Sequence, residues 1–96
     1  PHVDFMIQSF ADEPTERLWR GNPVRRIPAD LQRQALKRLG YLHAAQRLED
    51  LYAPPSNHFH ALAGSDCYAI QVNLQWRITF EWTPAGPAGV LFEDYH

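Results

Sequence analysis

The spacing of apolar residues divides the chain into a helical first half and a second half rich in strands. After Ile27-Pro28, apolar side chains recur at intervals of four and three, at Leu31, Ala35, Leu39 and Leu42. This period predicts an amphipathic helix, and Leu36 widens its apolar stripe. A further helical turn through Leu48 and Leu51 is expected to end at Pro54-Pro55, because the residue before a proline disfavours the α region.

The region before this helix predicts a short strand followed by a short helix. Residues 6–10 mix apolar and polar side chains, and we interpret them as a short half-buried strand. Asp12 then stands at the position of an N-cap, with Pro14 in the first turn of a helix that continues through Trp19. Gly21 is expected to end that helix.

From residue 57 onward the chain carries the signals of a sheet connected by hairpins. Strands are predicted at residues 59–62, 68–72, 76–82 and 90–94, with turn-forming residues at 64–66, 73–75 and 83–89. Within residues 76–82, the period of two places Arg77, Thr79 and Glu81 on the face opposite to the apolar residues. The order of elements favours an α+β domain, with two to three N-terminal helices packed on one face of a mainly antiparallel sheet of four to five strands.

The composition is that of one small ordered domain. The chain has 96 residues, 45% hydrophobic and 12% aromatic, which suits a single two-layer core. We assign the domain to residues 6–96 and interpret residues 1–5 as an expression remnant or an N-terminal extension. No apolar run approaches the ~18 residues that a membrane span needs. The single cysteine, Cys67, excludes an internal disulfide and argues against a thiolate zinc site, and these features favour a cytoplasmic protein without membrane contact.

Charge is distributed unevenly, although the formal net charge is only -2. The segment from residue 17 to residue 47 carries eight basic residues against one acid, Asp30, whereas the rest of the chain carries Arg77 against ten acids. A positive region of this kind is typical of nucleic-acid binding, and the alternative is that these are the solvated faces of ordinary helices. The candidate RNA-binding residues are Arg17, Arg20, Arg25, Arg26, Arg33, Lys37 and Arg38.

Metal-independent cleavage of RNA requires three groups around one phosphorus atom. A base removes the 2′-hydroxyl proton, a cation stabilises the phosphorane, and an acid protonates the departing 5′-oxygen. The residues whose side chains can supply these functions here are His60, Arg77, Tyr95 and His96, and we treat them as candidates. Tyr95 can also stack on an unpaired base, and Asp94 completes the set of candidate catalytic residues. This chemistry needs neither a metal nor a cofactor.

Two other interpretations of the same residues remain open at this point. A strand arginine commonly pairs with a neighbouring carboxylate, and for Arg77 the candidates are Glu81 and Glu93. His58 and His60 project from the same face if their segment is extended. A divalent-metal site would then consist of His58, His60, Asp94 and His96.

Several segments of the chain resemble the HigB-type toxins of the RelE superfamily, also known as the plasmid maintenance killer family. They are residues 6–10, Leu-Glu-Asp-Leu at 48–51, Pro-Pro-Ser-Asn at 54–57, Phe-His-Ala-Leu-Ala-Gly at 59–64, Asn-Leu-Gln-Trp-Arg-Ile-Thr-Phe at 73–80 and Glu-Asp-Tyr-His at 93–96. The most specific feature is the central Trp-Arg-Ile-x-Phe strand combined with a terminal Asp-Tyr-His, and the resemblance spans residues 6–96.

The resemblance implies a RelE-like microbial RNase fold and the toxin of a type II toxin-antitoxin system. Such a toxin is an endoribonuclease that inhibits translation by ribosome-dependent cleavage of mRNA. It implies a HigA-type helix-turn-helix antitoxin as partner, operator DNA contacted through that antitoxin, and ribosomal RNA phosphates as partners of the basic segment. His60 corresponds to a histidine of acid-base chemistry and Arg77 to an arginine that steadies the scissile phosphate. The terminal cluster corresponds to Asp94, Tyr95 and His96.

The chain departs from this pattern at Ala63, where many relatives carry a lysine three residues after the histidine. One cation near the phosphate is therefore missing. This departure favours a second function as the alternative, namely a catalytically weak homologue that acts mainly as an antitoxin-binding co-repressor module.

Overall fold

A computed structural model describes residues 6–94 of the chain. It contains two α-helices, two short 3₁₀ helices and four strands. In chain order these are α1 (Glu13–Trp19), α2 (Ala29–Ala44), η1 (Leu48–Tyr52), η2 (Pro55–Asn57), β1 (His60–Ala61), β2 (Cys67–Gln71), β3 (Trp76–Thr83) and β4 (Gly86–Asp94).

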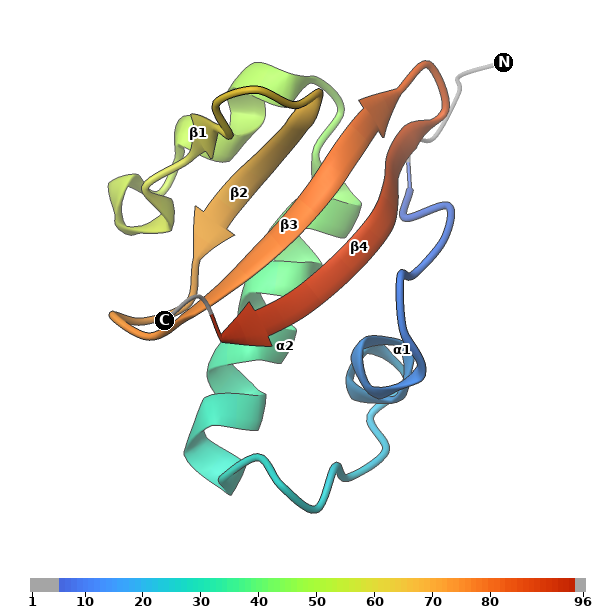
Figure 1. Cartoon of the computed structure of the whole chain (residues 1–96), viewed down its shortest axis with the longest axis vertical. Helices are drawn as coiled ribbons and strands as arrows, with labels where there is room; N and C mark the ends of the chain where they lie inside the picture. Colours follow the sequence, from blue (N-terminus) through green and yellow to red (C-terminus); the bar gives the residue numbers. More distant parts are fainter. Residues whose placement is uncertain (1–5, 95–96) are drawn as a thin grey trace.

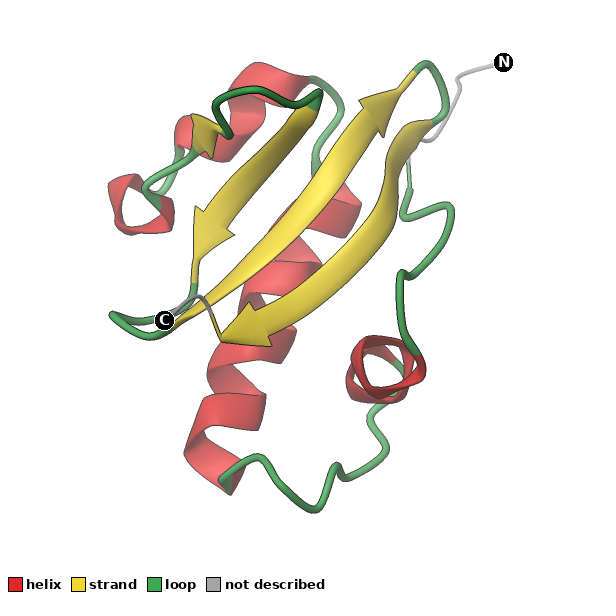
Figure 2. Ribbon diagram, in the orientation of Figure 1, coloured by secondary structure: helices red, strands yellow, loops and turns green. Residues whose placement is uncertain are grey.

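The four strands form one antiparallel sheet in the order β1-β2-β3-β4. Figure 1 shows α2 lying across the far face of this sheet, and Figure 2 shows that, within the described residues, no helix covers the near face of the three long strands. The helices therefore pack on one face of an antiparallel sheet, and the predicted α+β architecture is confirmed.

Helix α1 begins and ends where its sequence predicts. The Asp12 carboxylate accepts a hydrogen bond from the backbone N–H of Thr15 at 2.9 Å, and Pro14 lies in the first turn. The helix ends at Trp19, and Gly21 follows with a φ of +80°, a conformation that glycine adopts without strain.

Helix α2 supplies the helical side of the core. Its buried side chains are those predicted from the period of four and three: Leu31, Ala35, Leu39 and Leu42. They pack against a sheet face that includes Ile78 and Phe80. Leu36 is 38% exposed, so the prediction that it widens the apolar stripe is wrong. One residue beyond Ala35, the helix has turned by about 100° and its side chain points away from the sheet.

Residues 6–10 do not form a strand, contrary to the prediction. The segment runs parallel to β4 and makes one isolated bridge, between Phe10 and Val90. Ile7 and Phe10 pack against the core, but they are three residues apart, so the segment lacks the period of two that a strand requires. A continuous ladder is prevented partly by Pro87, which accepts a hydrogen bond from Gln8 N–H but has no N–H to return.

The predicted loop at residues 83–89 is shorter than expected, because β4 already begins at Gly86. Gly86 has a φ of +125°, and a Cβ atom there would lie 2.6 Å from the carbonyl oxygen of Met6. A bulge between Thr79 and Glu81 accommodates the irregular start of β4. Residues 86–89, which are typical of a turn, thus belong to an edge strand, and the N-terminal segment packs against the start of that strand.

Thr15 connects α1 to the outer edge of β4. Its hydroxyl accepts a hydrogen bond from the backbone N–H of Phe92 at 3.0 Å, and Thr15 itself is 1% exposed. Unpaired N–H groups at the edge of a sheet otherwise invite pairing with another chain. Helix α1 and the segment before it therefore cover this edge.

Candidate functional site

The candidate site lies on the sheet face that α2 does not cover. The register places His60 beside Ala69 of β2, and Ala69 beside Thr79 of β3. The adjacent row contains Gln71, Arg77 and Glu93. His60 and Arg77 therefore belong to neighbouring rows of one face, as the alternation within residues 76–82 predicts for Arg77.

The Arg77 guanidinium is held by Glu93, its direct neighbour on β4. The Nε and Nη2 atoms of Arg77 lie 2.9 and 2.8 Å from Glu93 Oε2, and the two side chains are 25% and 30% exposed. The prediction that Arg77 pairs with a neighbouring glutamate is confirmed, and of the two candidates the partner is Glu93. Two donors on one oxygen restrict the rotation of the guanidinium, so the pairing also fixes a cation on the open face.

His60 lies at the opposite side of this face, on a strand of only two residues. Its side chain is exposed, and its Nδ1 atom lies 2.7 Å from the backbone carbonyl oxygen of His58. His58 has a φ of +45°, so the segment is not extended there. The condition under which His58 and His60 would project from one face is not met. Among residues 6–94, no group of three or more His, Cys, Asp or Glu side chains is arranged to hold a metal ion.

One strand separates His60 from Arg77. Adjacent strands lie about 4.8 Å apart, so the two backbones are separated by about 10 Å. The strand between them, β2, contributes Ala69 and Gln71 to the floor. Ala69 is fully buried although its side chain belongs to the outer face. Ala69 therefore separates the strand of His60 from that of Arg77 without a side chain that projects between them.

Asp94 lies at the end of β4, beside the turn between β2 and β3. Its Oδ2 atom accepts a hydrogen bond from Gln75 Nε2 at 2.7 Å. The alternation along β4 gives Asp94 the side that Phe92 occupies, opposite to that of Glu93. Tyr95 and His96 lie outside the described residues, so the structure places three of the five predicted catalytic residues.

The seven candidate RNA-binding residues have different local environments. Several are engaged within the protein: Arg17 with the Pro23 carbonyl, Arg20 with Glu16, Arg33 with Asp30, and Arg38 with Ser56 and Asn57. Arg25, Arg26 and Lys37 are exposed, and within residues 6–94 they form no ion pair. These three cations are the most accessible to an external phosphate.

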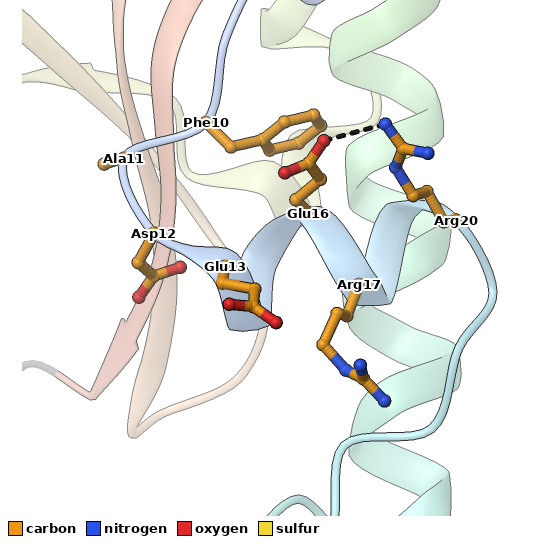
Figure 3. Close-up of a pocket in the computed structure, with 7 residues that line it drawn as sticks. All are labelled: Phe10, Ala11, Asp12, Glu13, Glu16, Arg17 and Arg20. Atoms are coloured by element: carbon orange, nitrogen blue, oxygen red, sulfur yellow. Dashed lines mark hydrogen bonds and ion pairs between the residues drawn. The ribbon is translucent and has the colours of Figure 1, made fainter.

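A groove along α1 shows why charge counted along the sequence overstates the local positive charge. It is lined by Phe10, Ala11, Asp12, Glu13, Glu16, Arg17 and Arg20. Figure 3 shows the ion pair of Glu16 with Arg20, whose atoms lie 2.9 Å apart. With three acids and two arginines, this groove is close to neutral. The unbalanced positive charge lies further along the chain, in the loop before α2 and on α2 itself.

Comparison with known proteins decides the family. A family model described as the RelE-like toxin of the type II toxin-antitoxin system HigB matches residues 8–96. The chain is 34% identical over 93 residues to Toxin HigB-1 of Vibrio cholerae, covering 94% of each protein. The chain belongs to the HigB-like toxin family. An uncharacterized protein of Haemophilus influenzae is 28% identical over 78 residues, which is 78% of this chain and 77% of that protein.

Membership of the HigB-like family confirms the resemblance seen in the sequence. The protein is the toxin of a type II toxin-antitoxin system, and an antitoxin is therefore its partner. The helices on an antiparallel sheet agree with the RelE-like fold of the family. No helix within residues 6–94 has the length and apolarity to cross a membrane.

The structure adds residues that the sequence did not single out. Asn57 is fully buried, and it links α2 to the segment that precedes His60. Arg38 is one of the candidate RNA-binding residues, yet its Nη1 atom lies 2.7 Å from Asn57 Oδ1. The only sequence signal for this pair is a polar residue within a segment rich in prolines. Such a residue is common in turns, so its burial was not predictable.

Proposed function

We propose that this HigB-family toxin inhibits translation by cleaving mRNA on the ribosome without a metal or cofactor. The observation that supports this most directly is the uncovered sheet face, where Glu93 fixes the Arg77 guanidinium and His60 lies one strand away.

The proposed reaction is an attack of the 2′-hydroxyl oxygen on the adjacent phosphorus. The new O–P bond forms as the bond to the 5′-oxygen breaks, which leaves a 2′,3′-cyclic phosphate and a 5′-hydroxyl. One group removes the 2′-hydroxyl proton and another protonates the 5′-oxygen, and we assign these two roles to His60 and His96. Arg77 stabilises the charge on the phosphorane, because its planar fork matches two phosphate oxygens. Tyr95 orients or stacks on the mRNA, and Asp94 belongs to the same terminal cluster.

The basic residues are proposed to dock the toxin on ribosomal RNA. Phosphate binding by Lys and Arg is largely independent of sequence and weakens with salt. Arg25, Arg26 and Lys37 have the most accessible charges of the predicted set. Arg17, Arg20 and Arg33 reach phosphate only if it competes with their internal partners. A HigA-type helix-turn-helix antitoxin is the proposed partner in the cytoplasm, and operator DNA is contacted through it.

Arg77→Ala tests the assigned site directly. In a purified translation reaction, mRNA cleavage is expected to fall about 10²–10³-fold, the usual effect of removing one group that stabilises transition-state charge. Glu81→Ala is a matched control, because Glu81 is exposed on the same strand and face. Wild-type cleavage by Arg77→Ala would remove Arg77 from the mechanism.

Two changes to the reaction test the rest of the proposal. A 2′-deoxy nucleotide at the cleaved position should abolish cleavage, because the attacking oxygen is absent. Leaving out the ribosome should also abolish it. Cleavage of free mRNA, or of the 2′-deoxy substrate, would contradict the proposed mechanism.

The alternative is a catalytically weak toxin that acts mainly as an antitoxin-binding co-repressor. Ala63 supports it, because this residue is exposed in the turn that follows the strand of His60 and supplies no cation. Ala63→Lys should raise toxicity strongly if the missing charge limits activity, and change it little if the wild type already cleaves efficiently. Operator binding by the antitoxin, measured with and without the toxin, tests the co-repressor role.

A further inference from the structure

The hydrogen bond between His60 and His58 determines which nitrogen of the His60 ring carries the proton. The carbonyl oxygen of His58 only accepts hydrogen bonds, so the Nδ1 atom at 2.7 Å must be the donor. In the neutral ring Nδ1 is then protonated, and the lone pair is on Nε2.

We propose that Arg38 and Asn57, by fixing the turn that ends at His58, hold the His58 carbonyl in place and with it His60 in the Nδ1–H tautomer, so that Nε2 is the atom that exchanges protons with the substrate. This inference rests on the proposed function for the role of His60 in cleavage. Arg38, Asn57 and His58 are positioning residues, because they act on the substrate only through His60.

His60 needs support from outside its own strand. Strand β1 has two residues, and its pairing with β2 fixes the backbone of His60 but leaves its exposed side chain free to rotate. The bond from Nδ1 to the His58 carbonyl is the contact that orients the ring. The position of that carbonyl depends on the backbone of His58, which has a φ of +45°. Few residues other than glycine adopt this conformation without help from their surroundings.

The turn before His58 supplies that help. The backbone N–H of His58 donates to the Pro55 carbonyl at 3.0 Å, and the N–H of Asn57 donates to the Pro54 carbonyl at 2.9 Å. The Asn57 side chain then closes the turn, because its Nδ2 atom lies 3.1 Å from the Leu51 carbonyl oxygen. A contact of 3.3 Å joins the same nitrogen to the Ala53 carbonyl.

Arg38 anchors this turn to α2. Its Nη1 atom donates to Asn57 Oδ1 at 2.7 Å and to Ser56 Oγ at 3.1 Å. The guanidinium also lies over the ring of Tyr41, 5.8 Å from its centre. Since Asn57 is 0% exposed, water cannot replace the guanidinium as the partner of its carbonyl oxygen. The orientation of the Asn57 amide, and with it the conformation of the turn, therefore depends on α2, which packs on the sheet face opposite to the candidate site.

This arrangement suits a group that both accepts and releases a proton. When Nε2 takes a proton, Nδ1–H continues to donate to His58, so the ring keeps its orientation in both charge states. A ring that had to rotate between the two states would lose the alignment on which general acid-base catalysis depends.

The test is a long-range ¹H–¹⁵N correlation spectrum of the full chain labelled with ¹⁵N-histidine, recorded at an alkaline pH at which imidazole rings are neutral. In the wild type, His60 should show a protonated Nδ1 and an unprotonated Nε2. In Arg38→Gln, we expect the Nε2–H tautomer to appear and mRNA cleavage at saturating ribosome to fall about tenfold, less than the ~10²–10⁴-fold contribution of a complete general acid or base.

Two further variants separate positioning from charge and from folding. Lys37→Gln removes the same charge one residue away on α2 and should leave the His60 tautomer unchanged. Arg38→Lys keeps the charge and should restore the Nδ1–H form in part, because an ammonium group can still reach Asn57. If Arg38→Gln does not fold, the wild-type spectrum decides the assignment without it.

The outcomes separate this inference from the proposed function. A protonated Nε2 in the wild type would overturn the inference even if the protein is a potent nuclease. Full cleavage by His60→Ala would overturn the assigned role of Nε2. Absence of any cleavage by the wild type, with His60 in the Nδ1–H form, would contradict the proposed function and leave the tautomer assignment intact.

Discussion

The two described ends of the candidate site are built in different ways. Arg77 lies in β3, a strand of eight residues paired on both sides, and its partner Glu93 is its direct neighbour across the strand pair. His60 lies on a strand of two residues, and its ring donates a hydrogen bond to the carbonyl of His58, in a turn that Arg38 of α2 anchors. The position of Arg77 therefore depends on the sheet, whereas that of His60 depends on side chains distant from the open face. We expect mutations in the helical layer to affect the two residues unequally.

Among the substitutions that distinguish the two ends of the site, Asn57→Leu is expected to change stability the most. The change removes a fully buried amide and leaves the Leu51 carbonyl and the Arg38 guanidinium without their partner. Loss of buried hydrogen bonds of this kind should lower the free energy of unfolding by about 2–4 kcal/mol, measured by urea denaturation.

Ser56→Ala is the control for Asn57→Leu, because Ser56 is exposed and its hydroxyl accepts only one hydrogen bond of 3.1 Å from Arg38. It should change stability by less than about 1 kcal/mol. Equal effects of the two variants would show that the buried amide is not what holds the turn.

Thr15→Val perturbs the end of the site that the sheet supports. Valine has the shape of threonine but cannot accept the hydrogen bond from Phe92 N–H, next to Glu93 in β4. A buried N–H without a partner should lower the free energy of unfolding by about 2 kcal/mol. Thr15→Ser retains the hydroxyl and should be closer to the wild type. If Val and Ser variants unfold alike, packing and not the hydrogen bond maintains the edge of β4.

Glu93→Gln tests how much the ion pair between Glu93 and Arg77 contributes to stability and to cleavage. The pair with Arg77 is partly exposed, so its loss should lower stability by about 1 kcal/mol or less, and by less at high salt. Cleavage should fall severalfold, because the guanidinium is held less firmly. Glu81→Gln, on the same face but exposed, is the matched control. A change in stability that does not depend on salt would argue against an electrostatic role for Glu93.

The smallest effect concerns Asp50, in the 3₁₀ turn that leads to the His60 segment. Backbone N–H groups of Arg47 and Gln46 donate to its carboxylate, both at 3.0 Å, and they lower its pKa below the usual 3.8. A lowered pKa in the folded state stabilises the fold above pH 3.8 and loses this contribution as the pH falls through the folded value. The free energy of unfolding of Asp50→Asn should therefore be furthest below that of the wild type near neutral pH. The difference should become smaller as the pH falls. Parallel stability curves between about pH 5 and pH 2 would rule out this linkage.

The same contrast between the two ends explains what the sequence could predict. The face of Arg77 followed from strict alternation, a local property of an extended chain. The conformation of His58 did not, because it depends on Asn57 and Arg38, which meet only after α2 has packed. The helical stripe was predicted except at Leu36, where rotation by one residue exposed the side chain.

The errors in the strand predictions have a shared cause. Gly86 belongs to a strand although its neighbours are typical of a loop, because the N-terminal segment packs against it. Residues 6–10 look like a strand but make one bridge only. In both cases a contact between distant parts of the chain overrides a local preference. The roles of Tyr95 and His96 stay predictions.

The contacts between residues 8–15 and β4 also bear on the order in which the protein is made. Ser9 and Thr15 bond to backbone groups of Val90 and Phe92, about 80 positions later in the chain. Helix α1 can therefore complete its contacts with the sheet only after β4 has been synthesised, and contacts of such long range slow folding. A toxin with this topology acquires its complete sheet only after β4 has left the ribosome.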